Sequence, residues 1–398
     1  MRARLLLCAS TALSALSCAL PSDGEAQDWT LDTSLSQQGV YSDNLLLDQD
    51  NEIDTVGSIT TPSFVLSRES PTLDVSLDAR FEFAEYFNHS DFSSQDQIVR
   101  LRSSKQFSQR STFDLNGDFR RDTILESEDD ETGQSVDEPV RYISWNVAPS
   151  WTYLLSPLDE VTIGGSYKEN SYDSSEKTDY QYFGGTVDYS HRLSEIDRAT
   201  AELRYFRYIP DRADDSPTDV VSVLFGYGYE PSDRLSLVGA AGVGYSMRDP
   251  DGSGGNEDGV GMRLKFDARY DLSDVTYTRF SLSHDSEPSG DGEQTTRNRA
   301  SLGLNQKLTP MTTIGLNLDY VDSYDYLGTE NDATSDERRS RYAQVRPSVS
   351  WLLTEDLSLV AEYSFRYKVF ENDSDPAVAN SVFLTLKYEL PTWGWSGY

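Results

Sequence analysis

The feature that most constrains this chain is a strict alternation of apolar and polar residues that recurs along most of its length. Between Leu73 and Phe83 every odd position is apolar and every even position is polar or charged. A period of two is that of a β-strand with one face against an apolar environment and the other against water. The chain is therefore expected to form long strands, each with one apolar face.

The alternation predicts 18 strands, joined by connections that are short and long in turn. An even number lets an antiparallel barrel close with both chain ends on one side. Short turns, such as 67–71, 156–159, 231–234 and 308–311, hold the turn formers Pro, Ser and Asp. The expected strands are 29–41, 55–67, 72–87, 96–107, 112–125, 140–153, 160–172, 178–192, 197–209, 218–230, 235–248, 259–271, 275–286, 295–308, 312–325, 339–354, 357–370 and 379–390.

A water-soluble β-sandwich is the alternative fold. The transmembrane barrel is favoured because the strands exceed the usual length in globular proteins and because short turns alternate with long loops. Aromatic residues near the strand ends also fit the girdles found at membrane interfaces: Tyr41, Tyr86, Phe87, Trp151, Tyr153, Tyr205, Tyr208, Tyr227, Tyr229 and Tyr367. We therefore expect an all-β outer-membrane barrel of about 18 antiparallel strands, with short periplasmic turns and longer acidic extracellular loops.

Residues 1–26 are typical of a secretory signal peptide. Arg2 and Arg4 precede an apolar stretch, and Gly24-Glu25-Ala26 offers small residues for cleavage before Gln27. The alternative is a lipoprotein site at Cys18, in an imperfect lipobox. Cleavage after residue 26 leaves 27–398 as a single barrel domain without cysteine, hence without a disulfide or a thiolate metal site. The mean hydropathy of −0.56 argues against a helical membrane protein.

The net charge of −33 makes nucleic acid an unsuitable partner, because phosphate binding requires a basic face. The acid concentrates in long connections such as 42–54, 126–139 and 249–258. These loops are either solvated surface or sites for divalent cations that bridge lipopolysaccharide. The segments 48–52 and 249–252 partly match calcium loops, but neither completes the twelve-residue pattern. We expect no specific metal site and no cofactor.

If the apolar face meets lipid, the polar face lines the interior, which is aqueous in a barrel of this size. Basic residues slightly outnumber acidic ones on that face. They either handle an anionic or neutral saccharide solute or polymer, or pair with acids on neighbouring strands and stiffen the wall. The predicted pore-lining set is Arg80, Arg100, Arg102, Arg120, Arg204, Arg263, Lys265, Arg269, Arg299, Arg346, Arg366 and Lys368.

The sequence offers little support for an enzyme. His89, His191 and His284 are isolated and lack the close spacing of a zinc site. No phosphate-binding or dinucleotide-binding loop occurs. A barrel hydrolase whose Ser and His partners lie far apart in sequence is the remaining enzymatic alternative. We predict no catalytic residues.

A motif of about sixty residues near the N-terminus indicates a family. Tyr41-Ser42-Asp43-Asn44 leads through an acidic loop to Thr61-Pro62-Ser63, and the alternating strand from Leu73 to Phe83 ends near Tyr86-Phe87. This pattern resembles the β-barrel porin type 2 family, which includes outer-membrane barrels associated with exopolysaccharide biosynthesis clusters. The end of the chain departs from the usual barrel signal, because residues 391–398 follow the last expected strand.

The resemblance implies a passive outer-membrane pore, either porin-like or a portal for the export of exopolysaccharide. The partners are then the membrane lipid and lipopolysaccharide and, for export, the polymer and periplasmic export machinery. It supplies no catalytic residues. The alternative function is a non-conducting structural or adhesion barrel whose acidic loops bind cations.

Overall fold

The computed structural model describes residues 27–124, 139–174, 177–211, 216–248, 257–288, 294–325, 339–370 and 375–397. They form a closed antiparallel barrel of 18 long strands, as predicted, followed by the short strand β19. The strands are β1 (Gln27–Ser42), β2 (Thr55–Ser70), β3 (Leu73–Tyr86), β4 (Ser94–Ser108), β5 (Ser111–Ile124), β6 (Val140–Leu154), β7 (Asp159–Tyr172), β8 (Tyr180–Arg192), β9 (Asp197–Pro210), β10 (Thr218–Ser232), β11 (Leu235–Arg248), β12 (Glu257–Ser273), β13 (Thr276–Pro288), β14 (Gln294–Thr309), β15 (Thr312–Asp325), β16 (Ser340–Leu352), β17 (Leu357–Phe370), β18 (Ala377–Glu389) and β19 (Trp393–Gly397).

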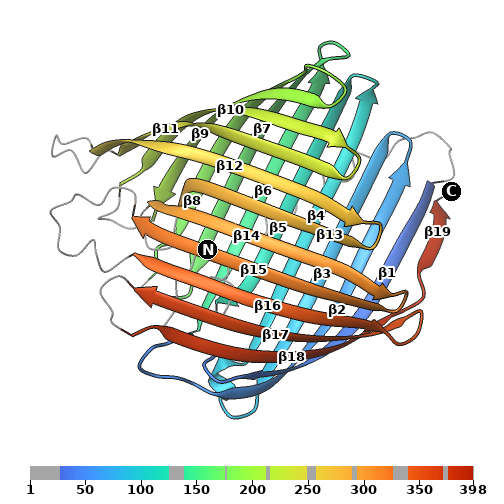
Figure 1. The fold of residues 1–398 in the computed structure, drawn as a ribbon, viewed down its shortest axis with the longest axis vertical. Helices are drawn as coiled ribbons and strands as arrows, with labels where there is room; N and C mark the ends of the chain where they lie inside the picture. Colours follow the sequence, from blue (N-terminus) through green and yellow to red (C-terminus); the bar gives the residue numbers. More distant parts are fainter. Residues whose placement is uncertain are drawn as a thin grey trace.

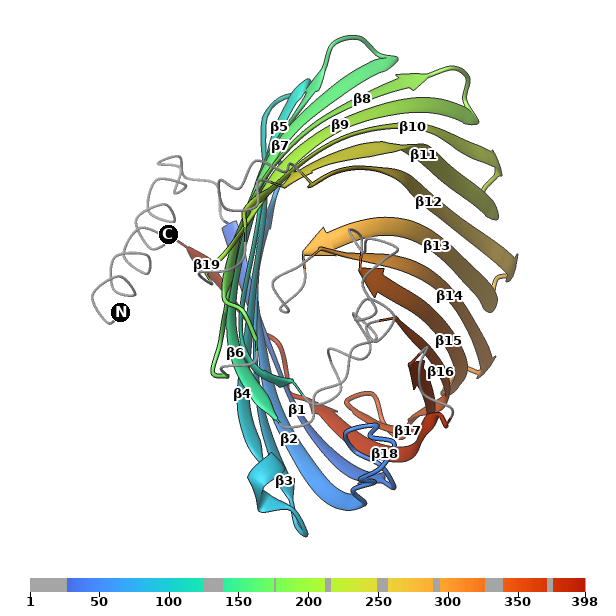
Figure 2. The ribbon, with the colours of Figure 1, turned by 90° about the vertical axis from the view of Figure 1, so that its left-hand side faces the viewer.

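Each long strand pairs with its neighbours in sequence, and β1 closes the barrel by pairing with β18. Figures 1 and 2 show the strands running obliquely around one wall, in which β12 and β13 pair near their turn and diverge toward the other rim. The short 3-10 helix η1 (Ser90–Phe92) lies in the connection after β3. In the described part of the chain, no helix is long and apolar enough to cross a membrane.

The two faces of the wall differ as the alternation predicts. Outward side chains are apolar and accessible, with Phe225 and Ile163 at 68% and 60% exposure. On the opposite face, Tyr342 and Ala379 are buried beneath the loop that follows β1. The face that includes these two residues is called the inward face below.

The two rims of the barrel also differ. One rim carries turns of a few residues, and in several of them a Ser hydroxyl accepts the N–H two positions later, as Ser156 does from Leu158 and Ser194 from Ile196. The other rim carries the longer connections. β1 begins and β18 ends at the short-turn rim, which is the periplasmic side in outer-membrane barrels.

The end of the chain extends the pairing of the last long strand. Ser34 to Ser42 of β1 pair with β18, whereas Gln27 to Leu31 pair with β19. Between the two segments, Leu390, Pro391 and Thr392 stand opposite only two residues of β1, which makes a bulge. A proline fits this position because it has no N–H for a regular ladder. Residues 391–397 therefore continue the wall.

Two residues of the predicted aromatic girdle do not face lipid. Tyr86 and Tyr208 are 7% and 1% exposed and lie on the inward face. Residues two positions apart on a strand share a face, and the residues two positions before these tyrosines, Ala84 and Phe206, are also buried and inward. For these two tyrosines the girdle assignment was wrong, because proximity to a strand end does not determine the face. In contrast, Tyr41, Phe87, Trp151, Tyr153, Tyr205, Tyr227 and Tyr229 are exposed.

Several expectations concern residues outside the described part of the chain. These are the signal peptide over 1–26 with Cys8 and Cys18, nearly all of the acidic connection 126–139, and the segment 249–252.

Candidate functional site: the inner wall of the barrel

Strand pairing places all the predicted pore-lining side chains on the inward face. Arg100, for example, stands opposite Asp78 and Asp118, and Arg346 stands opposite Asn317. The set comes from eight strands: Arg80 (β3), Arg100 and Arg102 (β4), Arg120 (β5), Arg204 (β9), Arg263, Lys265 and Arg269 (β12), Arg299 (β14), Arg346 (β16), and Arg366 and Lys368 (β17).

The first group of these residues lies on β4 and β5. Asp118 accepts from Nε of Arg120 at 2.9 Å and from Nε of Arg100 at 3.4 Å. One carboxylate thus holds two guanidinium groups on adjacent strands. This pairing is the arrangement in which basic residues stiffen the wall.

A second group bridges four strands on the other side of the barrel. Glu202 of β9 pairs with Arg204 at 3.2 Å and with Lys265 at 4.0 Å. Asp285 of β13 pairs with Arg263, and with Arg204 at 3.9 Å. Arg263 also donates to the hydroxyl of Ser222 on β10. Because Arg263 is only 5% exposed, its role is to join strands.

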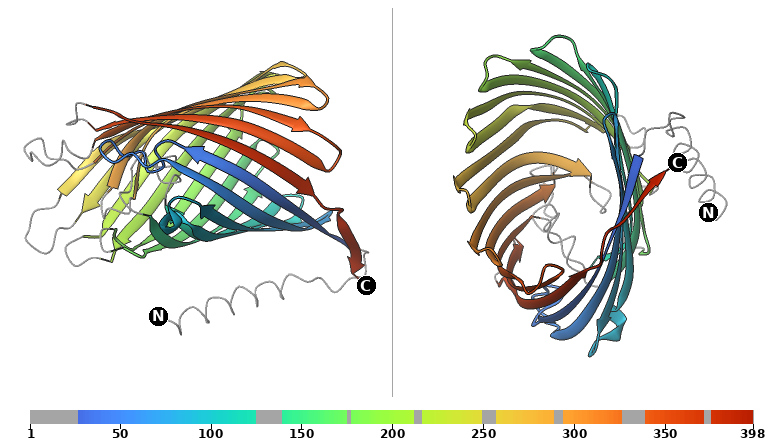
Figure 3. Two further views of the ribbon diagram at one scale, coloured as in Figure 1. Left: turned by 90° about the horizontal axis from the view of Figure 1, so that it is seen from below. Right: turned by 90° about the vertical axis from the view of Figure 1, so that its right-hand side faces the viewer.

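The third group anchors a loop inside the barrel. The connection Asp43–Asp54 turns inward at the long-loop rim, beside β18 (Figure 3). Nη2 of Arg366 donates to the carbonyl oxygens of Asn44 and Leu45, both at 3.2 Å. Arg366 and Lys368 are almost completely buried. Arg366 therefore supports the loop, and neither of these two predicted residues meets the open lumen.

Apolar side chains fix the same loop. Leu45 and Leu46 pack against Val40, Tyr86 and Phe92, whereas Leu47 packs against inward residues of β15, β16 and β18. Leu47 has a φ of 53°, the only positive φ of a non-glycine residue in the described chain. A leucine pays a conformational penalty there, so its packing must compensate.

The Tyr41–Asn44 motif forms the seam where the barrel closes. Asp43 accepts from the backbone N–H of Asn380 at 2.6 Å and from its side-chain amide at 2.8 Å. The hydroxyls of Ser42 and Ser381 bond at 2.9 Å. Asn44 donates to the carbonyl of Val378 at 3.1 Å. The motif therefore joins the end of β1 to β18, a structural role.

The remaining members of the set are dispersed. Arg80 lies 4.0 Å from Glu82, and Arg346 lies 3.7 Å from Glu362. Arg269 stands apart from these groups, close to the short-turn rim, and its guanidinium lies over the ring of Tyr277.

Sequence reasoning missed part of the inward face. The pairing also turns Arg198, Arg248 and Arg297 inward, together with Asp32, Glu69, Asp96, Asp122, Glu160 and Asp271. These additions narrow the predicted excess of basic over acidic side chains. The residues lie near strand ends, where the alternation of apolar and polar residues is weakest. They would have been found if the inward–outward alternation of each strand had been continued for two or three positions beyond its clear part. Tyr277 was missed because it belongs to no motif that would single it out in the sequence.

No group of three or more His, Cys, Asp or Glu suited to a metal ion occurs within the described ranges. In segment 48–52, the Asp48 carboxylate accepts the backbone N–H groups of Asp50 and Asn51 at 2.8 and 2.9 Å. This carboxylate shapes a turn of the inward loop.

Comparison with known protein families gives one match. A family described as "Protein of unknown function, DUF481" matches residues 218–340. No curated protein matches the chain.

Similar solved structures are outer-membrane barrels. The ferric citrate transporter FecA in the unliganded form gives a TM-score of 0.52 at 11% identity, covering 94% of this chain and 70% of that one. The outer membrane protein OpdK from Pseudomonas aeruginosa gives 0.46 at 11% identity, covering 92% and 99%. OccAB4 from Acinetobacter baumannii gives 0.44 at 10% identity, covering 94% and 100%. The closed antiparallel barrel, whose fold is similar to that of FecA, places this chain in the bacterial outer membrane.

Proposed function

We propose that the protein is an outer-membrane conduit whose inner wall passes anionic or neutral saccharide solutes or polymer, and that exopolysaccharide is exported through it. The observation that carries the proposal is the inward polar wall of a barrel of this size, which encloses water. Arginines that are only partly buried, such as Arg100 and Arg120, supply positive charge along that wall. The resemblance of the first hairpin to the β-barrel porin type 2 family supports export of polymer.

Single-channel recording in planar bilayers tests the conduit. We expect discrete conductance steps with a weak preference for chloride over potassium, measured as a reversal potential in a salt gradient. The double substitution Arg100→Gln and Arg102→Gln should reduce that preference, because it removes two positive charges from one strand. An unchanged reversal potential would contradict the role given to these side chains.

The second candidate is a non-conducting structural or adhesion barrel with cation-binding acidic loops. Two observations favour it: the ion pairs that bridge neighbouring strands and the loop that packs into the lumen beside β18. This candidate predicts a properly folded barrel without conductance steps. Heat-modifiable mobility on gels, measured on the same preparation, shows whether the barrel is folded.

A further inference from the structure

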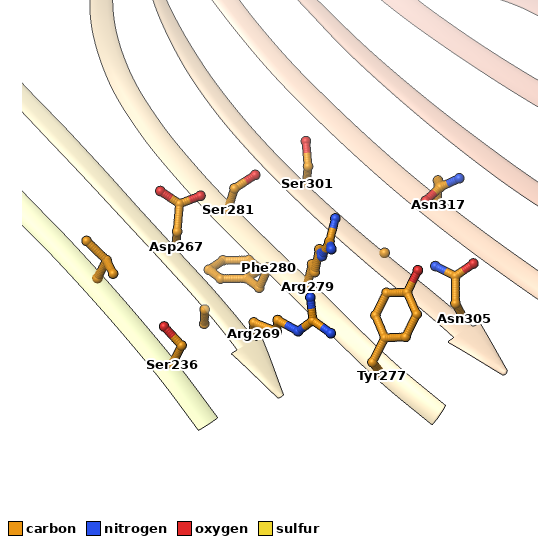
Figure 4. Close-up of a pocket in the computed structure, with 13 residues that line it drawn as sticks. Ser236, Asp267, Arg269, Tyr277, Arg279, Phe280, Ser281, Ser301, Asn305 and Asn317 are labelled. Atoms are coloured by element: carbon orange, nitrogen blue, oxygen red, sulfur yellow. The ribbon is translucent and has the colours of Figure 1, made fainter. Parts of the chain in front are cut away.

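A hollow on the inner wall crosses five strands, from β11 to β15. Its volume is about 390 Å³, within the range of small-molecule sites. Figure 4 shows Arg269 at the end of β12 and Tyr277 and Arg279 on β13, with Asn305 beyond the tyrosine ring. The ion-paired groups of β4, β5 and β9 contribute nothing to this lining.

Two positive charges meet in this hollow. Arg269 and Arg279 are paired positions on adjacent strands. Their guanidinium carbons lie 5.3 and 5.4 Å from the centroid of the Tyr277 ring. Like charges directly opposite one another destabilise a sheet, and a ring face offsets only part of that repulsion. An anion between the two groups would offset the rest.

The local carboxylates neutralise only one arginine of this pair. Arg269 has one ion pair, with Asp271 at 3.2 Å, and half of its side chain is exposed. Within the described residues no ion pair involves Arg279, and none joins Asp267 to either arginine. The fork of Arg279 is therefore available to a carboxylate from outside the chain.

Besides the carboxylate of Asp267 and a few apolar side chains, the lining carries neutral hydrogen-bonding groups. Ser281, Ser301, Asn305 and Asn317 offer hydroxyl and amide groups, which can both donate and accept. Gly303 stands between Arg279 and Asn317 in the sheet, and a Cβ there would lie 3.2 Å from Oδ1 of Asn317. The absence of a side chain at this position keeps the floor of the hollow free.

The hollow opens toward the periplasmic mouth. A second cavity, of about 450 Å³, shares Ser236 and Arg269 with it and reaches Asp233 and Arg234 in the turn between β10 and β11. This turn belongs to the short-turn rim. A solute that enters from the periplasm meets the hollow near the start of its path.

From this geometry we infer that the Arg269–Tyr277–Arg279 hollow is a binding subsite for a hexuronate, a sugar that carries a carboxylate. The two guanidinium groups bind the carboxylate, and the serine and asparagine side chains bind ring hydroxyls. A role for this subsite in transport rests on the proposed conduit. In that role the subsite would select acidic saccharides as cargo at the periplasmic entrance.

Ligand-observed saturation-transfer NMR on the full-length barrel in detergent micelles tests the subsite, with sodium glucuronate as the probe and glucose as its neutral counterpart. We expect glucuronate to bind at least about tenfold more tightly than glucose, because a charge-assisted hydrogen bond is worth that much or more. Arg279→Gln should weaken glucuronate by about tenfold or more. Gly303→Val should weaken it similarly while leaving every charge in place.

The matched control is Lys387→Gln, which removes one inward positive charge at the same rim on β18. Lys387 is paired with Glu389 at 2.8 Å and lies outside the hollow. It should leave glucuronate affinity within about twofold, a change below 0.5 kcal/mol. Equal losses in Lys387→Gln and Arg279→Gln would overturn the subsite, since general attraction to a positive lumen would then explain binding. Unchanged affinity in Arg279→Gln would overturn it directly.

Two further measurements keep the outcome interpretable. If Arg279→Gln fails to fold, Arg279→Lys retains the charge but loses the fork, and affinity equal to the parent overturns bidentate binding. NMR does not require conduction, so the subsite and the conduit fail separately. Conductance without glucuronate binding refutes the subsite alone, whereas glucuronate binding by a barrel without conductance refutes the conduit.

Discussion

Replacement of Leu47 tests how the inward loop is held. Leu47 is 1% exposed and packs against Val321, Tyr342, Ala377 and Ala379. Truncation to alanine in such a site costs about 2–5 kcal/mol. Leu47→Ala should therefore favour local opening of the loop by roughly 30- to 4,000-fold.

The positive φ of Leu47 makes the comparison with glycine informative. Leu47→Gly loses the same contacts, but glycine adopts a φ of 53° without the penalty that alanine keeps. The difference is about 1 kcal/mol in favour of glycine, so the loop of Leu47→Gly should open about fivefold less often than that of Leu47→Ala.

Hydrogen–deuterium exchange of the 45–47 backbone amides, measured by mass spectrometry, reports this opening. The amide of Leu45 bonds to the carbonyl of Ile53 at 2.9 Å and is protected only while the loop is closed. Faster or equal exchange in Leu47→Gly, compared with Leu47→Ala, would refute the reasoning.

Leu45 provides the matched control. It is fully buried in the same loop, and its φ is not positive. Here the order should reverse, because glycine has the larger entropy to lose, by roughly 0.5–1 kcal/mol. Leu45→Gly should exchange about two- to fivefold faster than Leu45→Ala.

Two further predictions concern the stability of the wall. A Cβ at Gly242 would lie 1.9 Å from the carbonyl oxygen of Val223, so Gly242→Ala should lower the temperature at which gel mobility shifts. Gly239→Ala is the control, because its nearest contact is at 3.5 Å, and it should leave that temperature unchanged. Equal temperatures for the two variants would contradict the close packing at Gly242. Asp43→Ala should lower the same temperature as well, by breaking two hydrogen bonds to Asn380 that together are worth about 1–3 kcal/mol, whereas an unaltered temperature would show that the seam does not depend on them.

The barrel itself could be predicted from the sequence because alternation specifies the face of each residue. From Leu73 to Phe83 the parity is unbroken, and a slip of one residue would turn every apolar side chain into the lumen. The assignment of Arg100 and Arg269 to the interior followed from that parity alone.

The contacts of those residues were beyond sequence reasoning. Arg269 and Arg279 meet because β12 and β13 pair in one register, with an irregularity after Asp271 that no periodicity reveals. Leu47 reaches residues some 275 positions or more further along the chain, on strands that only closure of the barrel brings near. Likewise, the bulge at Pro391 hid the continuation of the wall in residues 393–397.

The pairing of Ser34 with Glu389 has a consequence for assembly. The free edge of the first strand finds its hydrogen-bonding partner only in the last strand. Every intermediate made from part of the chain therefore carries two unpaired strand edges. Such edges are templates for pairing with other chains. The hazard of aggregation therefore persists until the final strand arrives, and a chaperone that shields β1 would be needed for most of the time that the polypeptide spends in transit.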